Sequence, residues 1–553
     1  MKVKIIFLLF AASISGSSIK AQELKDNFYV KLLQEELQRN IKRLHLPELG
    51  KPFLISYQLR NQYGLGLNAE RGEITSQVKE PLVNKMAWIK LRVGDYHRNF
   101  DYMIFDGYRV SFPDENDVDE YRRLLWLETD RAYKNNSRQY SSFMSSLKRL
   151  NVDEKELALD DLGKITPVQK DFGAAQPIHI NVEDWEKKLK SLSALFKQHP
   201  SITTSYCRLT INSFEDYIVS SEGTIIRKPG GDVSFVAYGA AFDDKGDNFN
   251  SNYSVTVKNI DELPSFDELE ASVKKLIEKI SEKEKAPSFE GSYMGPVLFT
   301  GEAVTDIVLQ CFNSSLKTTR KSILGYGPGG TDYEEKLGQK LVSSDLSVIA
   351  RPALKKFNGQ SLTGYFPIDE QGVQPPDSLV LIEAGILKSL LNGRTPTRKF
   401  STSQGFDRSF AGRAYNAGVL ELRSAKMVPQ DSMYSQLIRL AKEEGLPSAY
   451  IVDQLSMGRT EVYKIDVATG KIEMLKECKI TPLNQKSLRR FVVASHQQQV
   501  KNQSGLSVLA PQSIIVNEVE IEKNEITTKP KPIIVSNPLL EKQVAEKKPR
   551  RRR

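Results

Sequence analysis

Apolar residues recur every three or four positions in four parts of the chain, which is the spacing of a helix with one buried face. Pro47 follows the first of these segments and cannot continue a helix. Ser265 and Glu268 stand at the start of the last one with the spacing of a capping box. The predicted helices cover residues 26–46, 116–150, 183–199 and 265–280.

Runs of β-branched and aromatic residues lie between these helices and predict strands. Ser221, Glu222 and Gly223 separate two such runs and are typical of a tight hairpin turn. The predicted strands of the first half cover residues 53–58, 87–93, 108–112, 208–211, 217–220, 223–226 and 234–238.

A polar link that contains Pro and Gly, residues 284–293, separates the two halves of the chain. Beyond it, to about residue 522, one helix is followed mostly by short strands punctuated by Gly and Pro. The predicted fold class is therefore α+β, with an N-terminal mixed α/β portion and a large, mostly antiparallel β domain that has one helix at its start. The predicted units are an N-terminal α/β domain (22–176), a central α/β region (177–290) and a C-terminal β domain (291–525).

The first 21 residues have the pattern of a secretory signal peptide. Lys2 and Lys4 precede about ten apolar residues, and small residues lead to a predicted cleavage after Ala21. The alternative is an apolar first strand, although the sequence changes abruptly to a polar helical pattern from Gln22 onward. We therefore expect an exported protein, either periplasmic or extracellular.

The net charge of +9 at neutral pH comes from the two ends of the chain. Residues 526–553 hold nine Lys or Arg and two Asp or Glu, whereas residues 1–21 hold three Lys and no acid. The remainder is close to neutral, so nucleic-acid binding by the folded part is not expected. For residues 526–553 we predict a disordered basic tail, which either contacts an anionic envelope surface or is simply solvated.

Histidine and cysteine are too scattered to predict a local metal site. No two of the five His lie within a helical turn of each other, and no C-x-x-C pair occurs. Three buried thiols are the simplest prediction for Cys207, Cys311 and Cys478.

One segment is more informative, because it places two acids on a predicted helix directly after a short buried strand. Glu302 and Asp306 are four residues apart and share one face of that helix. Two carboxylates at this spacing could bind a metal or act as an acid/base pair. The alternative is that they are simply acids near a helix N-terminus, where the helix dipole favours negative charge. The predicted buried face comprises Val304, Ile307, Val308, Cys311 and Phe312.

Four stretches of the second half resemble the TldD/TldE (PmbA) family of zinc metallopeptidase complexes, in the family's order. The first reads G-P-V-L-F-T-G-E-A, and the third reads Y-N-A-G-V-L-E-L. The second fits the family's strand, tight turn and second strand at Asp377, Glu383, Gly385, Leu387 and Lys388. The four stretches are residues 295–303, 376–397, 415–422 and 506–520.

The resemblance implies a test of the helix that carries Glu302. Catalytic TldD-type subunits carry H-E-x-x-x-H there, with two His on zinc, a Glu that activates water, and a distant Cys. If Glu302 is matched to the family's Glu, Gly301 and Asp306 stand at the two His positions. Asp306 and Cys478 are then the remaining metal candidates. The chain is closest to the metal-free TldE type, so no cofactor is expected in it and zinc is expected in a partner.

The resemblance also implies partners. A TldE-type subunit pairs with a TldD-type subunit that carries H-E-x-x-x-H, and the two enclose a cavity for unfolded peptide. Self-association is the other arrangement to consider. Candidate cavity-facing residues are Tyr365, Arg394 and Asn416, which could equally be turn or sheet residues without a functional role.

Three hypotheses follow for the function. The first is a non-catalytic subunit of a peptidase complex, which acts in proteolysis through its partner. The second is a non-enzymatic envelope binding or assembly protein that keeps the fold. The third is an active metallopeptidase with an altered site that contains Glu302, Asp306 and Cys478 or a distant His. Fold alone cannot choose among them.

Overall fold

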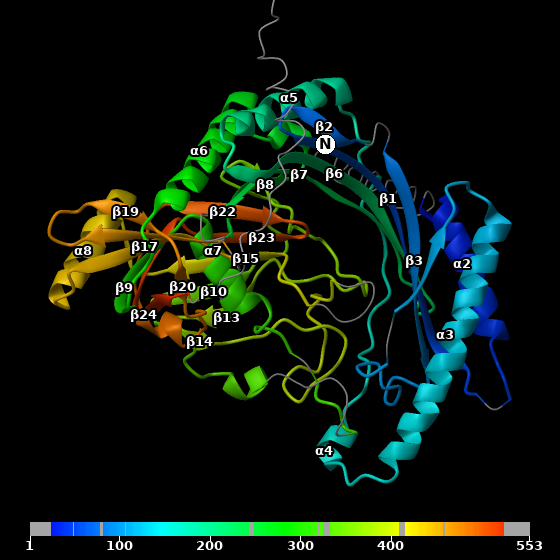
Figure 1. Cartoon of the computed structure of the whole chain (residues 1–553). Coiled ribbons are helices and arrows are strands. Elements are labelled where there is room, and N and C mark those ends of the chain that lie inside the picture. Colours follow the sequence, from blue (N-terminus) through cyan, green and yellow to red (C-terminus); the bar gives the residue numbers. More distant parts are fainter. Residues whose placement is uncertain are drawn as a thin grey trace, which may run out of the picture.

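The computed structural model describes residues 24–47, 49–77, 81–104, 107–242, 248–318, 320–324, 332–408, 415–456 and 459–524. The predicted signal peptide (1–21) and the predicted basic tail (526–553) lie outside these residues. Among the described helices, none is long and apolar enough to cross a membrane. The predicted α+β class is confirmed, and Figure 1 shows the arrangement of its helices and strands.

The first half of the chain contains one eight-stranded sheet. Its order is β4-β3-β1-β6-β7-β5, with β2 beside β1 and β8 beside β7. The predicted turn at 221–223 joins β6 to β7. The strands are β1 (Pro52–Glu70), β2 (Glu73–Gln77), β3 (Leu82–Val93), β4 (Tyr108–Phe112), β5 (Gln169–Asp171), β6 (Ile202–Ser220), β7 (Ile225–Phe242) and β8 (Asn248–Val257).

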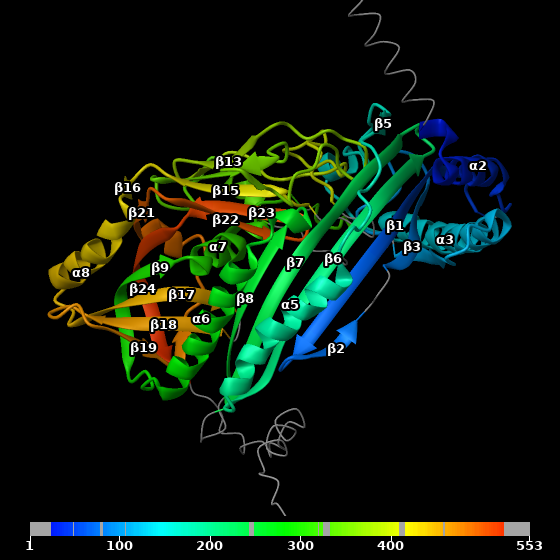
Figure 2. The ribbon, with the colours of Figure 1, turned by 90° about the horizontal axis from the view of Figure 1, so that it is seen from above.

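Helices cover one face of this sheet (Figure 2). Odd-numbered positions of β1 and β6, such as Tyr57, Leu67 and Leu209, are buried under the helices. The Ser265–Glu268 capping box is confirmed at the start of α6. The helices are α2 (Phe28–Arg43) and α3 (Val118–Leu147) at one end and α5 (Val182–Ala194) and α6 (Phe266–Lys285) at the other, with the short α4 (Glu154–Leu157) beyond α3.

The structure joins the two regions predicted as 22–176 and 177–290, because β1 pairs with β6 from Ser56–Ser220 to Ala69–Cys207. The predicted strands 208–211 and 217–220 are both parts of β6. Local patterns cannot indicate such pairings, because the paired residues lie more than a hundred positions apart. The first half is therefore built on one sheet whose second face, lined by even-numbered positions, turns toward the second half.

The second half contains two large sheets, and its first strand, β9, begins at the last two residues of the predicted link. One has the order β14-β13-β10-β15-β23-β22, and the other has the order β16-β21-β24-β9-β17-β18-β19 with β20 beside β24. The strands are β9 (Ser292–Thr300), β10 (Leu346–Ala350), β13 (Leu379–Glu383), β14 (Ile386–Leu387), β15 (Val419–Ser424), β16 (Met427–Val428), β17 (Ser448–Ser456), β18 (Arg459–Asp466), β19 (Ile472–Leu475), β20 (Cys478–Ile480), β21 (Phe491–Ser495), β22 (Gln498–Gln503), β23 (Leu506–Pro511) and β24 (Ser513–Lys523), beside a small hairpin of β11 (Lys356–Phe357) and β12 (Gln360–Ser361).

Most strand pairs of this half are antiparallel, as predicted; β15–β23, β16–β21 and β9–β17 are parallel. The helix α7 (Glu302–Val308) lies at its start, but α8 (Met433–Glu443) is a second helix that was not predicted. Met433, Leu437 and Ala441 of α8 are buried at four-residue spacing against β9 and β17. That spacing is visible in the sequence, but the sequence analysis predicted only the helix at the start of this domain.

Candidate functional site

The candidate site is built on α7, which follows the central strand β9 after a single residue. The five apolar residues predicted as its buried face are all buried in the main core of the second half. Glu302 and Asp306 lie on the other side of the helix and line a groove toward the first sheet. The sequence therefore predicted both faces of α7 correctly.

Lys501 of β22 lies between these two acids. Its Nζ donates to Oε2 of Glu302 at 3.3 Å and to Oδ1 of Asp306 at 3.2 Å. The Lys501 and Asp306 side chains are only 21% and 14% exposed, so solvent screens this contact weakly. An ammonium group therefore lies between the two carboxylates that the sequence offered as a metal or acid/base site and offsets part of their charge.

A second charged cluster continues the site along α6. Lys279 pairs with Glu461 at 2.5 Å and approaches Asp453 at 3.8 Å. Burial alone lowers the pKa of Lys279, but the carboxylates of Glu461, Asp453 and Glu302 together outweigh it and hold that pKa above the usual lysine value. Gln454 lies between the two clusters, because its Nε2 donates to Oε2 of Glu302 at 3.1 Å and because it is paired in register with Glu461.

The groove comprises two cavities that share Asn252, Glu302 and Gln454. The larger one, of about 530 Å³, lies between strands β6 to β8 and the α7–β22 side of the second half. The smaller one, of about 320 Å³, lies between β8, α6 and β17. The site is therefore a contact between the two halves, where ligand pockets are common.

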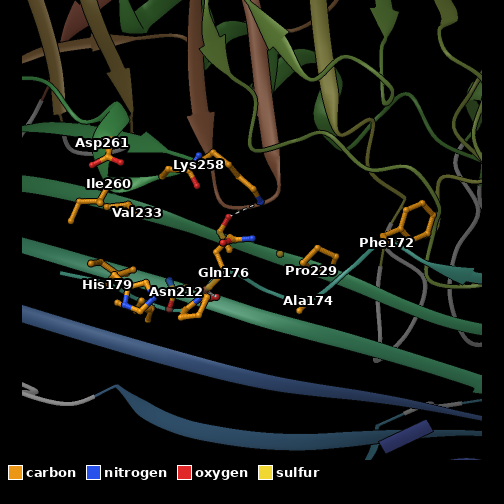
Figure 3. A pocket seen from close by; sticks show the side chains of 17 residues that line it. Phe172, Ala174, Gln176, His179, Asn212, Pro229, Val233, Lys258, Ile260 and Asp261 are labelled. Carbon is orange, nitrogen blue, oxygen red and sulfur yellow. Dashed lines mark hydrogen bonds between the residues drawn. The ribbon is translucent and has the colours of Figure 1, made fainter. Parts of the chain in front are cut away.

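A further cavity of about 470 Å³ adjoins the groove at Asn212 (Figure 3). The segment from Phe172 to His179 forms one wall, and Lys258 to Asp261 form another. Nζ of Lys258 donates to the carbonyl oxygen of Gly231 at 3.0 Å, and burial lowers the pKa of this lysine. Neither Glu302 nor Asp306 lines this cavity.

Gly301 stands at the first His position of the family motif. Its backbone conformation is one that favours glycine over every other residue. Its φ is +52° and its ψ is −125°, a region that residues with a Cβ rarely adopt. No atom would lie within 4 Å of an added Cβ, so backbone conformation rather than space opposes a histidine here. Gln499 of β22 fixes this turn by donating to the Gly301 carbonyl at 2.7 Å.

These residues do not fit a zinc ion. Among the described residues, no group of three or more His, Cys, Asp and Glu side chains is placed to hold a metal. Gly301 has no ligand atom, and the carboxylates of Glu302 and Asp306 already contact an ammonium group.

Cys478 lies far from the acids along the sheet. It pairs with Lys523 at the end of β24 that faces Ser292, whereas Glu302 follows the opposite end of β9. Burial raises the pKa of its thiol to about 12, so it is not a ready thiolate ligand. The structure thus separates Cys478 from Glu302 and Asp306.

All three cysteines are free, and Cys207 and Cys311 are buried as predicted, whereas Cys478 is partly exposed.

The three residues suggested as cavity-facing do not line the groove. Tyr365 lies under the ammonium of Lys355, with Nζ 5.2 Å from its ring centre. Asn416 accepts a hydrogen bond from the Gly418 amide at 2.7 Å and so closes a turn.

Arg394 is buried in a two-point ion pair with Glu222, in which both N–O distances are 2.7 Å. Glu222 belongs to the β6–β7 turn, and Arg394 also donates twice to the carbonyl of Gly163. The arginine therefore fastens the second half to the first sheet, a role that the sequence did not indicate.

Sequence reasoning also missed Lys501 and the polar face of β6 to β8. The ammonium of Lys501 reaches acids almost two hundred positions away, and no local pattern marks such a contact. The alternation in β7 and β8 was detectable, because Ser234, Ser254 and Thr256 interrupt apolar residues at every second position.

Comparisons with known proteins support the resemblance. Residues 290–456 match a family model described as the PmbA/TldA metallopeptidase C-terminal domain. No curated protein matches the chain.

Solved structures share the fold at 12–13% identity. They include a proposed modulator of DNA gyrase from Thermotoga maritima (TM-score 0.57, 12% identity, 91% of this chain and 100% of that one). Another is TldE from Thermococcus kodakarensis (TM-score 0.55, 12% identity, 89% of this chain and 99% of that one). A third is a proposed modulator of DNA gyrase from Bacteroides thetaiotaomicron (TM-score 0.59, 13% identity, 90% of this chain and 99% of that one). The chain is thus similar to the TldD/TldE (PmbA) family, by sequence over residues 290–456 and by fold over most of its length.

Proposed function

We propose that this chain is the non-catalytic, TldE-type subunit of a zinc metallopeptidase complex that acts on peptides or unfolded segments. One observation carries the proposal: the ammonium of Lys501 contacts both Glu302 and Asp306 where a catalytic subunit would carry its metal motif. The conformation of Gly301 supports it, because a ligand side chain at that position would strain the backbone.

The proposed partner is a TldD-type chain with H-E-x-x-x-H, which supplies the zinc and the general base. The groove between the two halves would then belong to the cavity that the complex encloses. Residues 1–21 support export, so we place the complex in the periplasm or outside the cell. The basic residues 526–553 would contact an anionic envelope surface there.

The proposal predicts that Glu302 takes no part in hydrolysis. The mature chain alone should not cleave an unfolded peptide such as reduced casein, and adding a TldD-type partner should yield an active complex that co-purifies. Glu302→Gln should leave the rate of hydrolysis by the mixture unchanged within about twofold, because a side chain that does not stabilise the transition state can be changed with little effect on the rate.

The matched control is the same Glu→Gln change in the partner's H-E-x-x-x-H, which should abolish cleavage. Hydrolysis by the isolated chain that falls at least tenfold with Glu302→Gln would instead establish the altered metallopeptidase. If no TldD-type chain co-purifies, the envelope-binding alternative takes first place.

A further inference from the structure

The larger cavity of the groove is lined by two strands that each have a free edge. Among the described strands, β8 pairs only with β7, and β22 pairs only with β23. Asn252, Ser254 and Thr256 of β8 and residues 501–503 of β22 line the cavity. A free strand edge binds an extended peptide through its main chain, whatever the sequence of that peptide, so any selectivity of the groove comes from the side chains around it.

The side chains that line the groove leave it negatively charged. Five carboxylates and three lysines line its two cavities, and no Arg or His is among the lining residues. Glu302 and Asp306 share the ammonium of Lys501, and Glu461 contacts that of Lys279. The excess of acids attracts a cationic ligand and repels an anionic one. The acids are Asp232, Glu302, Asp306, Asp453 and Glu461, and the lysines are Lys275, Lys279 and Lys501.

Asp232 of β7 is a buried member of this set and has no cation of its own. It lines the larger cavity and is 6% exposed. Its carboxylate accepts hydrogen bonds from two neutral groups, the hydroxyl of Ser504 at 2.7 Å and the amide of Asn212 at 3.4 Å. No Lys or Arg of the described residues forms an ion pair with it, since the nearby ammonium of Lys258 donates to the Gly231 carbonyl instead. Buried carboxylates are normally paired with a cation, so a ligand that supplies one is expected here.

Two further acceptors of the groove are unsatisfied. Oε1 of Gln454 and Oδ2 of Asp306 are buried and accept no hydrogen bond within the part of the chain that the structure describes. Gln454 is 6% exposed and lines both cavities. Buried acceptors normally have a donor, and the side chains of Lys and Arg carry donors and no acceptor. A cationic side chain therefore supplies both the charge and the donors that the groove lacks.

We propose that this groove selects peptides that carry Lys or Arg side chains, and that Asp232 pairs with such a side chain. The inference rests on the proposed function, because it takes the groove as a site for peptide, and it adds the chemical class of that peptide. An acidic peptide would bring like charges beside Asp232, whereas a neutral peptide would leave that carboxylate without a cation.

Fluorescence anisotropy of the full mature chain, purified alone, tests the preference with three labelled peptides. Their sequence is Gly-Ser-X-Ser-Gly-X-Ser-Gly, in which X is Lys, Gln or Glu. The Lys peptide should bind at least about tenfold more tightly than the Gln peptide, and the Glu peptide should bind most weakly. The difference should shrink as the salt concentration rises, because salt screens the attraction.

Asp232→Asn should bring the affinities of the Lys and Gln peptides within about threefold of each other, because it removes the charge and keeps an acceptor for Ser504. Asp119→Asn is the matched control and should leave the preference unchanged. Asp119 is exposed on α3 and lines neither cavity of the groove.

Lys501→Met should act in the opposite direction and strengthen binding of the Lys peptide by about threefold or more, because it frees Glu302 and Asp306 for the ligand. This variant keeps the inference testable if the circular dichroism of Asp232→Asn shows that it does not fold. Opposite shifts in the two variants are not expected from a general loss of structure.

Equal binding of the three peptides would overturn the inference, as would a preference that neither variant changes. Absence of binding by the Lys peptide would also overturn it. None of these results decides the proposed function, because cleavage of reduced casein by the mixture with a TldD-type partner tests that role separately.

Discussion

Arg394→Met should lower the free energy of unfolding by about 3–5 kcal/mol, because it leaves the Glu222 carboxylate buried without its cation. The Arg394 and Glu222 side chains are 4% and 9% exposed, so water cannot replace the lost contact. Among the residues that the structure describes, the hydroxyl of Tyr96, which donates to Glu222 at 2.7 Å, is then the remaining hydrogen-bond donor to that charge. The midpoint of urea unfolding, followed by far-UV circular dichroism, measures the effect.

The double variant Arg394→Met with Glu222→Gln separates the ion pair from simple packing. It should recover part of the loss, since no buried charge is then left unpaired. Arg439→Met is the matched control, because Arg439 and Glu443 form an exposed pair on α8 that contributes less than about 1 kcal/mol. An Arg394 variant no less stable than this control would show that the two halves are held together by other contacts.

Lys501→Met should cause the second largest loss of stability. It should also leave the two acids free to bind a cation. Removing the ammonium leaves Glu302 and Asp306 without their shared donor, at a cost of about 1–3 kcal/mol. Their carboxylate oxygens are ligands that Ca²⁺ prefers. Calcium at ten times its dissociation constant should then restore about 1.4 kcal/mol of stability to the variant.

Three comparisons test this interpretation of Lys501. Calcium should not stabilise the unmodified chain by a comparable amount, because the ammonium of Lys501 already lies between the two carboxylates. Lys501→Arg should retain most of the stability, since it keeps the charge. Adding Glu302→Gln and Asp306→Asn to Lys501→Met should remove the calcium effect. Equal stabilisation of the unmodified chain by calcium would contradict the assignment of Lys501 as the resident cation.

The sequence predicted those features that depend on local pattern. The two faces of α7, the capping box of α6 and the hairpin turn at 221–223 each follow from a few neighbouring residues, and each is confirmed. The family resemblance also pointed to the helix on which the groove depends. These predictions hold because helix periodicity, caps and turns are set by short-range physical chemistry.

The remaining features depend on contacts between distant parts of the chain. The pairing of β1 with β6 merges two predicted regions into one sheet, and the pairing of Arg394 with Glu222 spans 172 positions. The family resemblance suggests Arg394 as a polar cavity-facing residue, whereas the structure pairs it with Glu222 of the first half. Its partner decides its role, and sequence spacing does not identify that partner.

We expect this chain to hold no catalytic zinc of its own. Elemental analysis of the mature chain, purified alone and without a His-tag, tests it most directly through the ratio of zinc to protein. We expect a ratio far below one, because Gly301 offers no ligand and Lys501 contacts the two nearest carboxylates. One tightly held zinc ion per chain would contradict the claim and make this chain the enzyme.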